Sequence, residues 1–232
     1  MNKQPIDSIK KQAIKEFAEK VKEYINDKVM KDFDDSDSVK YYTIDLDEFE
    51  SEIDELVEQY IPLCPLSSLP AGQHFLYNNV EFVKLGDEQG GTLCITADIW
   101  KQVPFDKDEH NNFAKSSLRD VLITSFLPSL NDSDLCLYKM DLTADNGDRS
   151  YGTLFTLAGL LSANLYRKYR DYIPQYNIAI MTCTPAYCGD TVDYIRCVGP
   201  GRVLADYCTG FDWGVVPAVI FKKNTQIQLK NS

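Results

Sequence analysis

The chain has 232 residues, a net charge of −11 and 44% hydrophobic residues, enough for one sizeable core and a smaller second unit. An acidic balance of this size argues against a nucleic-acid partner and against anionic membrane surfaces, because both need a basic face. No apolar run approaches the roughly 18 residues of a membrane helix, and the start lacks the apolar core of a signal peptide. We therefore expect a cytoplasmic or virion-associated protein without membrane insertion.

The first part of the chain is predicted to be an acidic helical segment. Residues 1–60 hold nine Lys, no Arg and seventeen Asp or Glu. Apolar residues recur three or four apart over 6–33, which predicts an amphipathic helix, and a second helix at about 46–60 ends at Pro62. We interpret 1–62 as this segment. Its apolar stripe packs either on the same chain or in a homo-oligomer through the N-terminal helix, and the sequence leaves both open.

After this segment the pattern changes to short strands and short capped helices. The stretch 64–72 contains Pro, Ser and Gly and is interpreted as a linker. Residues 80–85 and 92–97 are predicted to pair as a hairpin around the turn 86–91. The other expected elements are a helix at 116–122 with a Ser cap, a helix at 163–169 capped by Ser162, and strands at 138–142 and 154–157.

The last fifty residues predict further strands. A strand at 178–185 precedes a hairpin of 194–198 and 203–207 around Gly199-Pro200-Gly201. The apolar run 213–221 is expected to be the final strand and to be central, with Pro217 at a bulge or at the strand start. The predicted fold class is α+β, with a twisted antiparallel sheet in a domain of residues 74–222.

Five short phrases occur in order along this domain: Ser117-Leu118-Arg119, Tyr166-Arg167-Lys168-Tyr169-Arg170, Thr184-Pro185, Val198-Gly199-Pro200-Gly201-Arg202-Val203 and Gly214-Val215-Val216-Pro217-Ala218. In this order they resemble a family of uncharacterised domains of gut Firmicutes and their phages, over about residues 74–222. Two positions depart from that family: Val216 stands where it usually has Arg, and Ile178-Ala179-Ile180-Met181 replaces its Trp-rich strand.

The resemblance implies a fold and a function. The family is similar in layout to C-type-lectin and formylglycine-generating-enzyme-like folds, and some such domains are variable proteins of diversity-generating retroelements, which present interchangeable residues on a rigid scaffold. The resemblance thus implies a C-type-lectin-like domain that recognises an unknown protein or surface ligand without catalysis, with 187–213 as the candidate diversified stretch. The alternative is a structural or host-modulating phage protein without a variable binding patch.

Residues typical of catalytic and metal sites are sparse. Only His74 and His110 occur, no C-x-x-C pair exists, and phosphate-binding or nucleophile-elbow motifs are absent. The Asp-rich run 32–38 lacks the spacing of a calcium-binding EF-hand. We therefore expect no enzyme, no cofactor and no metal. The seven Cys are expected to be mostly reduced and buried. Disulfides stay open for Cys183, Cys188, Cys197 and Cys208.

The candidate ligand-binding residues are aromatic and charged, the types that dominate recognition hot spots. Strand alternation should turn Tyr194 and Arg196 outward and Ile195 and Cys197 toward the core. Gly210 is expected to let the next loop turn tightly, and we expect Tyr194, Arg196, Tyr207, Phe211 and Asp212 in one exposed patch. The plainer interpretation puts Tyr194 and Trp213 in the core. The full candidate set is Tyr187, Asp190, Tyr194, Arg196, Tyr207, Phe211, Asp212 and Trp213.

Overall fold

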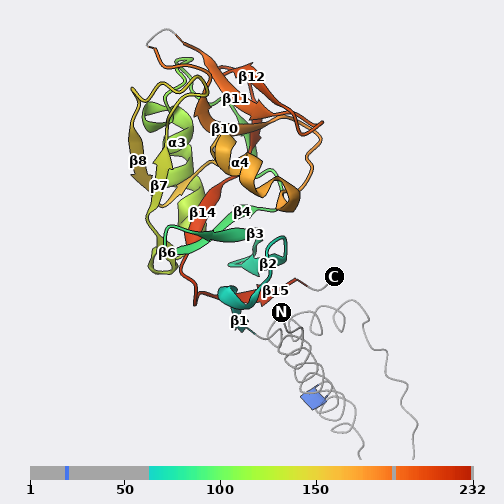
Figure 1. The fold of residues 1–232 in the computed structure, drawn as a ribbon. Coiled ribbons are helices and arrows are strands. Elements are labelled where there is room, and N and C mark those ends of the chain that lie inside the picture. Colours follow the sequence, from blue (N-terminus) through green and yellow to red (C-terminus); the bar gives the residue numbers. More distant parts are fainter. Residues whose placement is uncertain (1–18, 21–62, 190–191, 231–232) are drawn as a thin grey trace, which may run out of the picture. The chain divides into compact units, whose positions relative to one another are not determined.

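The computed structural model describes residues 19–20, 63–189 and 192–230. The chain divides into two units, residues 1–63 and 64–232. Within the predicted segment 1–62, Glu19 and Lys20 are helical and exposed, and the two predicted helices and their role in assembly otherwise lie outside the described residues. The fold below is therefore that of the second unit, which Figure 1 shows in colours from cyan to red.

The second unit is built mostly from antiparallel strands, with two short helices, and this confirms the mixed, sheet-rich class. Its larger sheet has eight strands in the order β1-β15-β2-β3-β4-β14-β6, and β9 also pairs with β14. In chain order these are β1 (Leu63–Pro65), β2 (His74–Tyr77), β3 (Val80–Glu88), β4 (Gly91–Thr96), β6 (Leu135–Cys136), β9 (Ala158–Gly159), β14 (Ala218–Phe221) and β15 (Gln226–Leu229).

A smaller sheet has five strands in the order β12-β11-β10-β13-β5. All its pairs are antiparallel except β10 with β13, which run parallel. The strands β10 to β12 lie at the end of the unit opposite β1 and β15 (Figure 1). Its members are β5 (Lys101–Val103), β10 (Ile180–Pro185), β11 (Tyr194–Val198), β12 (Leu204–Cys208) and β13 (Trp213–Val215), and a separate hairpin joins β7 (Tyr138–Asp141) to β8 (Thr153–Thr156).

Both helices begin at the predicted serine caps. The Ser116 hydroxyl accepts from the Arg119 N–H at 3.2 Å at the start of α3 (Ser117–Val121). The Ser162 hydroxyl accepts from the Leu165 N–H at 3.2 Å at the start of α4 (Ala163–Tyr169). These bonds satisfy backbone donors that a helix start leaves unpaired. Helix α3 continues through a π-helical turn, Leu122–Phe126, and single 3-10 turns occur at Leu66–Ser68, Phe113–Lys115, Leu127–Ser129, Asp132–Asp134 and Arg170–Tyr172.

An aromatic cluster fills the core against the larger sheet. Phe75 and Phe82 stack with ring centroids 5.7 Å apart, and Phe221 meets Phe82 edge-on at 5.3 Å. All three side chains have no exposed surface. Burying one such side chain stabilises the fold by about 1.5–3 kcal/mol. The larger sheet therefore has a well-packed aromatic core.

The stretch 64–72 is not a linker. Cys64, Leu66 and Leu69 are buried, and the ammonium of Lys84, only 7% exposed, donates to the Leu66 and Leu69 carbonyls at 3.2 and 2.6 Å. The prediction was wrong because the Pro and Ser residues here form a turn whose carbonyls are bound by Lys84 of β3. Since β15 also pairs with β2, the unit extends past both ends of the predicted domain 74–222.

The apolar run 213–221 is not one strand and is not the last. Its first part, β13, belongs to the smaller sheet, while β14 is central in the larger one. Val216 and Pro217 carry the chain between the two sheets. The Pro217 carbonyl accepts from the Thr96 N–H at 3.1 Å. Because proline has no N–H to give a strand ladder, it occupies the crossing point.

Candidate recognition surface

The β11–β12 hairpin shows the predicted alternation along its first strand. Ile195 and Cys197 have no exposed surface, whereas Tyr194 is 37% exposed. The Arg196 side chain is 26% exposed. Strand β11 therefore turns one face to the core and presents Tyr194 and Arg196 on the other.

Tyr207 lies on the opposite face from these two residues, so the expectation of a single patch is wrong. Tyr207 pairs with Ile195, while Cys208 pairs with Tyr194. Directly opposite residues in an antiparallel pair share one face of the sheet. At the turn, the Gly199 N–H donates to the Val203 carbonyl at 2.9 Å, and Val198 pairs with Leu204. A register shifted by one residue would instead set Tyr194 opposite Tyr207.

Tyr207 instead belongs to an aromatic group with Trp213 and Phe211. The Tyr207 and Trp213 rings meet edge-on with centroids 4.7 Å apart, and the Phe211 ring lies 6.4 Å from that of Trp213. The Trp213 indole N–H donates to the Cys208 carbonyl at 2.9 Å. Phe211 remains 62% exposed. The half-buried Trp213 ring thus packs against the exposed Phe211 ring.

The loop between β12 and β13 presents Phe211 and the exposed Asp212. Its start is fixed because the Thr209 N–H donates to the Asp193 carbonyl at 2.7 Å. Gly210 is not among the glycines with a positive φ, so its conformational freedom is not what the loop requires. A Cβ at Gly210 would lie 2.8 Å from Glu109 Oε1. Because this oxygen is the far end of a flexible side chain, a larger residue at Gly210 would require the Glu109 side chain to shift.

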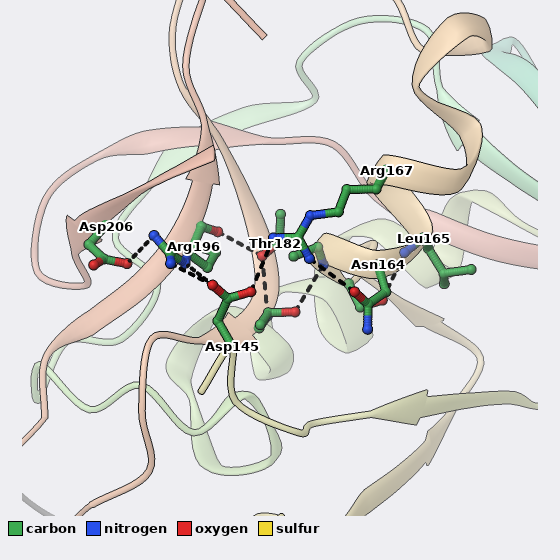
Figure 2. A network of polar contacts seen from close by, with 10 residues as sticks. Asp145, Asn164, Leu165, Arg167, Thr182, Arg196 and Asp206 are labelled. Atoms are coloured by element: carbon green, nitrogen blue, oxygen red, sulfur yellow. Dashed lines mark hydrogen bonds and ion pairs between the residues drawn. The ribbon is translucent and has the colours of Figure 1, made fainter. Parts of the chain in front are cut away.

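Arg196 is held in an ion-pair network (Figure 2). Its Nε and Nη2 donate to Asp145 Oδ2 at 2.9 and 2.5 Å, and its Nη1 lies 3.0 Å from Asp206 Oδ1. Arg167 Nη2 donates to the second Asp145 oxygen at 3.2 Å. Burial raises the pKa of Asp145, but hydrogen bonds from Arg196 and Arg167 outweigh it and hold that pKa below its usual range. The Arg196 guanidinium thus binds two carboxylates and holds β11 and β12 to the segment that contains Asp145.

A buried amide organises the loop that precedes β11. Asn111 has no exposed surface, and its Nδ2 donates to the Tyr187 and Tyr194 carbonyls at 2.8 and 3.0 Å. Its Oδ1 accepts from the Tyr151 hydroxyl at 2.7 Å, and the same hydroxyl accepts from the Gly189 N–H at 2.9 Å. Asn111 therefore ties together both ends of the loop 187–194. Sequence reasoning missed it, since an Asn in a polar loop carries no pattern of its own.

Tyr187 and Tyr194 are exposed aromatic side chains at the two ends of this loop. Tyr187 is 47% exposed. The Cys208 thiol next to Tyr194 raises the pKa of the Tyr194 phenol, and the Tyr187 phenol adds to this rise. The backbone carbonyls of both residues are held by the same Asn111 amide. Asp190 lies outside the described residues.

A cleft of about 550 Å³ lies beside the same loop. Three segments far apart in the sequence, 110–115, 150–151 and 188–189, form its walls. Because Tyr187 directly precedes one wall, the cleft borders the aromatic surface. We call it the donor cleft, and its lining residues are His110, Asn112, Ala114, Lys115, Ser150, Tyr151, Cys188 and Gly189.

The two histidines make local contacts. His74 Nδ1 lies 2.6 Å from Glu81 Oε1. His110 Nδ1 lies 2.5 Å from the Asp108 carbonyl and 3.6 Å from Asp106 Oδ2. Among the residues that the structure describes, no group of three or more His, Cys, Asp and Glu is placed to hold a metal ion. No described helix is long and apolar enough to cross a membrane.

All seven cysteines are free thiols. Burial raises the pKa of Cys183 to about 12 and also raises that of Cys188. Since the thiolate is the nucleophile in cysteine chemistry, a raised pKa disfavours that role. These two thiols therefore do not have the electrostatic surroundings of an activated pair. The chain matches no family model, no curated protein and no solved structure.

Proposed function

We propose that the unit 64–232 is a recognition module on a C-type-lectin-like scaffold and that it binds a protein partner without catalysis. The surface that binds lies at the open end of the β11–β12 hairpin, where the Thr209 N–H donates to the Asp193 carbonyl. It is formed by Tyr187, Tyr194 and Phe211, with Asp212 at its margin. The observation that supports this most is the combination of exposed aromatic rings with a rigid polar framework beneath them. Asn111 and the Arg196 network supply that framework.

The exposed aromatic area is of useful size. An aromatic side chain buries about 150–250 Å² when fully covered. The three rings are 47%, 37% and 62% exposed, so together they present on the order of 300 Å². A standard interface covers about 800 Å² on each partner. The three rings therefore form the centre of such an interface, and the surrounding polar side chains form its rim.

The separation of buried from exposed residues supports the proposal that 187–213 is a diversified stretch. Within this stretch Ile195, Cys197 and Thr209 have no exposed surface, whereas Tyr187, Tyr194, Phe211 and Asp212 face solvent. Exchanging the exposed set leaves the core contacts of the buried set unchanged. This is the requirement of a variable protein of a diversity-generating retroelement.

The test measures how alanine substitutions change the affinity for a selected ligand. Binders to the full-length wild-type chain are selected from a displayed library of protein fragments, and their affinities are measured for Tyr187→Ala, Tyr194→Ala and Phe211→Ala. We expect at least one substitution to weaken binding by more than about fivefold, as expected of a hot spot, with an unchanged unfolding midpoint.

Phe155→Ala is the matched control, because Phe155 is 56% exposed on β8 and outside the proposed surface. It should leave the affinity unchanged. If the selected binders respond to Phe155→Ala and to none of the three surface substitutions, the proposed surface is wrong.

A further inference from the structure

The donor cleft next to Tyr187 has a chemistry that points to a particular ligand group. We propose that it binds a carboxylate of the partner, so that a peptide segment places its aromatic or apolar residues on the exposed rings and one carboxylate in the cleft. This inference rests on the proposed recognition function and adds the charge of the partner's contact residue to it.

The cleft carries hydrogen-bond donors that the described chain does not use. The Lys115 ammonium makes no hydrogen bond or ion pair within the described residues. Asn112 Oδ1 accepts from the Ala114 N–H at 3.0 Å, which leaves its amide N–H₂ as a donor. The His110 side chain is 55% exposed and uses only Nδ1. With Nδ1 donating to the Asp108 carbonyl, the neutral His110 ring leaves Nε2 as an acceptor. The two unused donor groups are therefore the Asn112 amide and the Lys115 ammonium, three positions apart in the chain.

Two carboxylates close to the cleft segments in sequence, Asp106 and Asp148, are engaged by their own loops. Asp106, 5% exposed, accepts from the Ser117 and His110 backbone N–H groups at 2.8 and 3.1 Å. Asp148 accepts from the Ser150 hydroxyl at 2.5 Å. No described acidic side chain forms an ion pair with Lys115, and an external carboxylate is the natural complement for it.

The wall of the cleft is held in place before any ligand arrives. The Tyr151 hydroxyl bonds the Gly189 N–H at 2.9 Å and the Asn111 amide at 2.7 Å. Asn111 is fully buried and fixes the Tyr187 carbonyl next to the wall. A wall fixed in this way loses little conformational entropy on binding, which favours the affinity of the contact.

The size and charge of the cleft favour a carboxylate over a phosphate group. Sites for phosphate typically use arginine forks or helix N-termini with several converging charges. Here one lysine and one neutral amide donor line about 550 Å³, room enough for an amino-acid residue as well as its carboxylate. The carboxylate comes either from an Asp or Glu side chain or from a chain terminus.

Four probe peptides separate these sources. Acetyl-Phe-Asp-amide offers a side-chain carboxylate, and acetyl-Phe with a free C-terminus offers a terminal one. Acetyl-Phe-Asn-amide and acetyl-Phe-amide are their neutral counterparts. Each is titrated into the full-length chain and followed by amide NMR shifts at residues 110–115 and 150–151. We expect at least one acidic probe to bind about tenfold more tightly than its neutral counterpart, a difference of about 1.4 kcal/mol.

Lys115→Met should abolish this preference, while Lys139→Met should preserve it. Lys139 is an exposed lysine on β7, outside the cleft. The inference is overturned if acidic and neutral probes bind alike, if Lys115→Met keeps the preference, or if the acidic probes cause no shifts up to their solubility. A partner that loses affinity through Phe211→Ala but not through Lys115→Met would leave the proposed function standing and remove the carboxylate site.

Discussion

Asn111 is the residue whose replacement should most clearly loosen the proposed surface. Asn111→Ala removes three hydrogen bonds: those to the Tyr187 and Tyr194 carbonyls and that from the Tyr151 hydroxyl. The Tyr194 carbonyl keeps a bond from the Ala186 N–H, so mainly the Tyr187 carbonyl is left without a partner. With about 1 kcal/mol net for each of the three bonds and about 1 kcal/mol more for the unpaired carbonyl, the expected loss is about 4 kcal/mol.

The assay is urea denaturation of the full-length chain, followed by hydrogen exchange of the backbone amides. We expect a lower midpoint and the largest loss of protection at residues 186–189 and 192–194. Asn111→Asp should cost more than Asn111→Ala, because a carboxylate would face the same two carbonyls that the amide now donates to. Asn177→Ala, at an exposed asparagine, should change little. A loss of less than 1 kcal/mol for Asn111→Ala would refute the reasoning.

Three further outcomes are expected. The folded pKa of Asp145 lies below its unfolded value of about 4. The carboxylate therefore stabilises the fold above about pH 4, and this stabilisation is lost as the pH falls through the folded pKa. Arg196→Met should make the urea midpoint less dependent on acid pH, and an unchanged dependence would contradict the ion pair between Arg196 and Asp145. Lys84→Met should cost about 2 kcal/mol, because the Leu69 carbonyl loses its partner while the Leu66 carbonyl keeps a bond from the Leu69 N–H; a stabilised variant would contradict this and show that burying the ammonium is the larger cost. Tyr207→Ala should lower the melting temperature through the lost Trp213 contact and Tyr194→Ala should not, as calorimetry would show; equal shifts would contradict the assignment of these two residues to opposite faces of β11 and β12.

Local chemistry made much of this fold predictable. Ser116 and Ser162 cap helices because their hydroxyls satisfy unpaired backbone N–H groups, and this depends on neighbours in the sequence alone. The hairpin of β3 and β4 follows from a Gly-containing turn between apolar runs. The alternation of Ile195 and Cys197 with exposed neighbours follows from strand geometry.

The register of the second hairpin was not predictable in the same way. Strands ending at Val198 and starting at Val203 would set Tyr194 opposite Tyr207. In the structure Arg202 takes the left-handed conformation, with a φ of 62°, and its side chain donates to the Ile173 carbonyl. A tertiary contact therefore selects the turn, and a shift of one residue moves every side chain of β12 to the other face.

The candidate site was predictable only where exposure follows from periodicity or loop position. Tyr194 and Phe211 face solvent as expected, whereas Arg196 is occupied by Asp145 and Asp206, which are 51 and 10 positions away in sequence. The donor cleft joins segments near residues 112, 150 and 188. No pattern within any one of these segments indicates that they meet, because their meeting depends on the packed fold.

Hydrogen exchange of the full-length chain, with and without a selected protein ligand, tests the recognition surface most directly. Mass spectrometry of the exchanged peptides locates the protection to short segments. The recognition surface predicts that bound ligand protects backbone amides at 186–189, 192–196 and 209–213 more than those of any other segment. Protection concentrated on β7 and β8, at 138–141 and 153–156, with none on the three predicted segments, would contradict it.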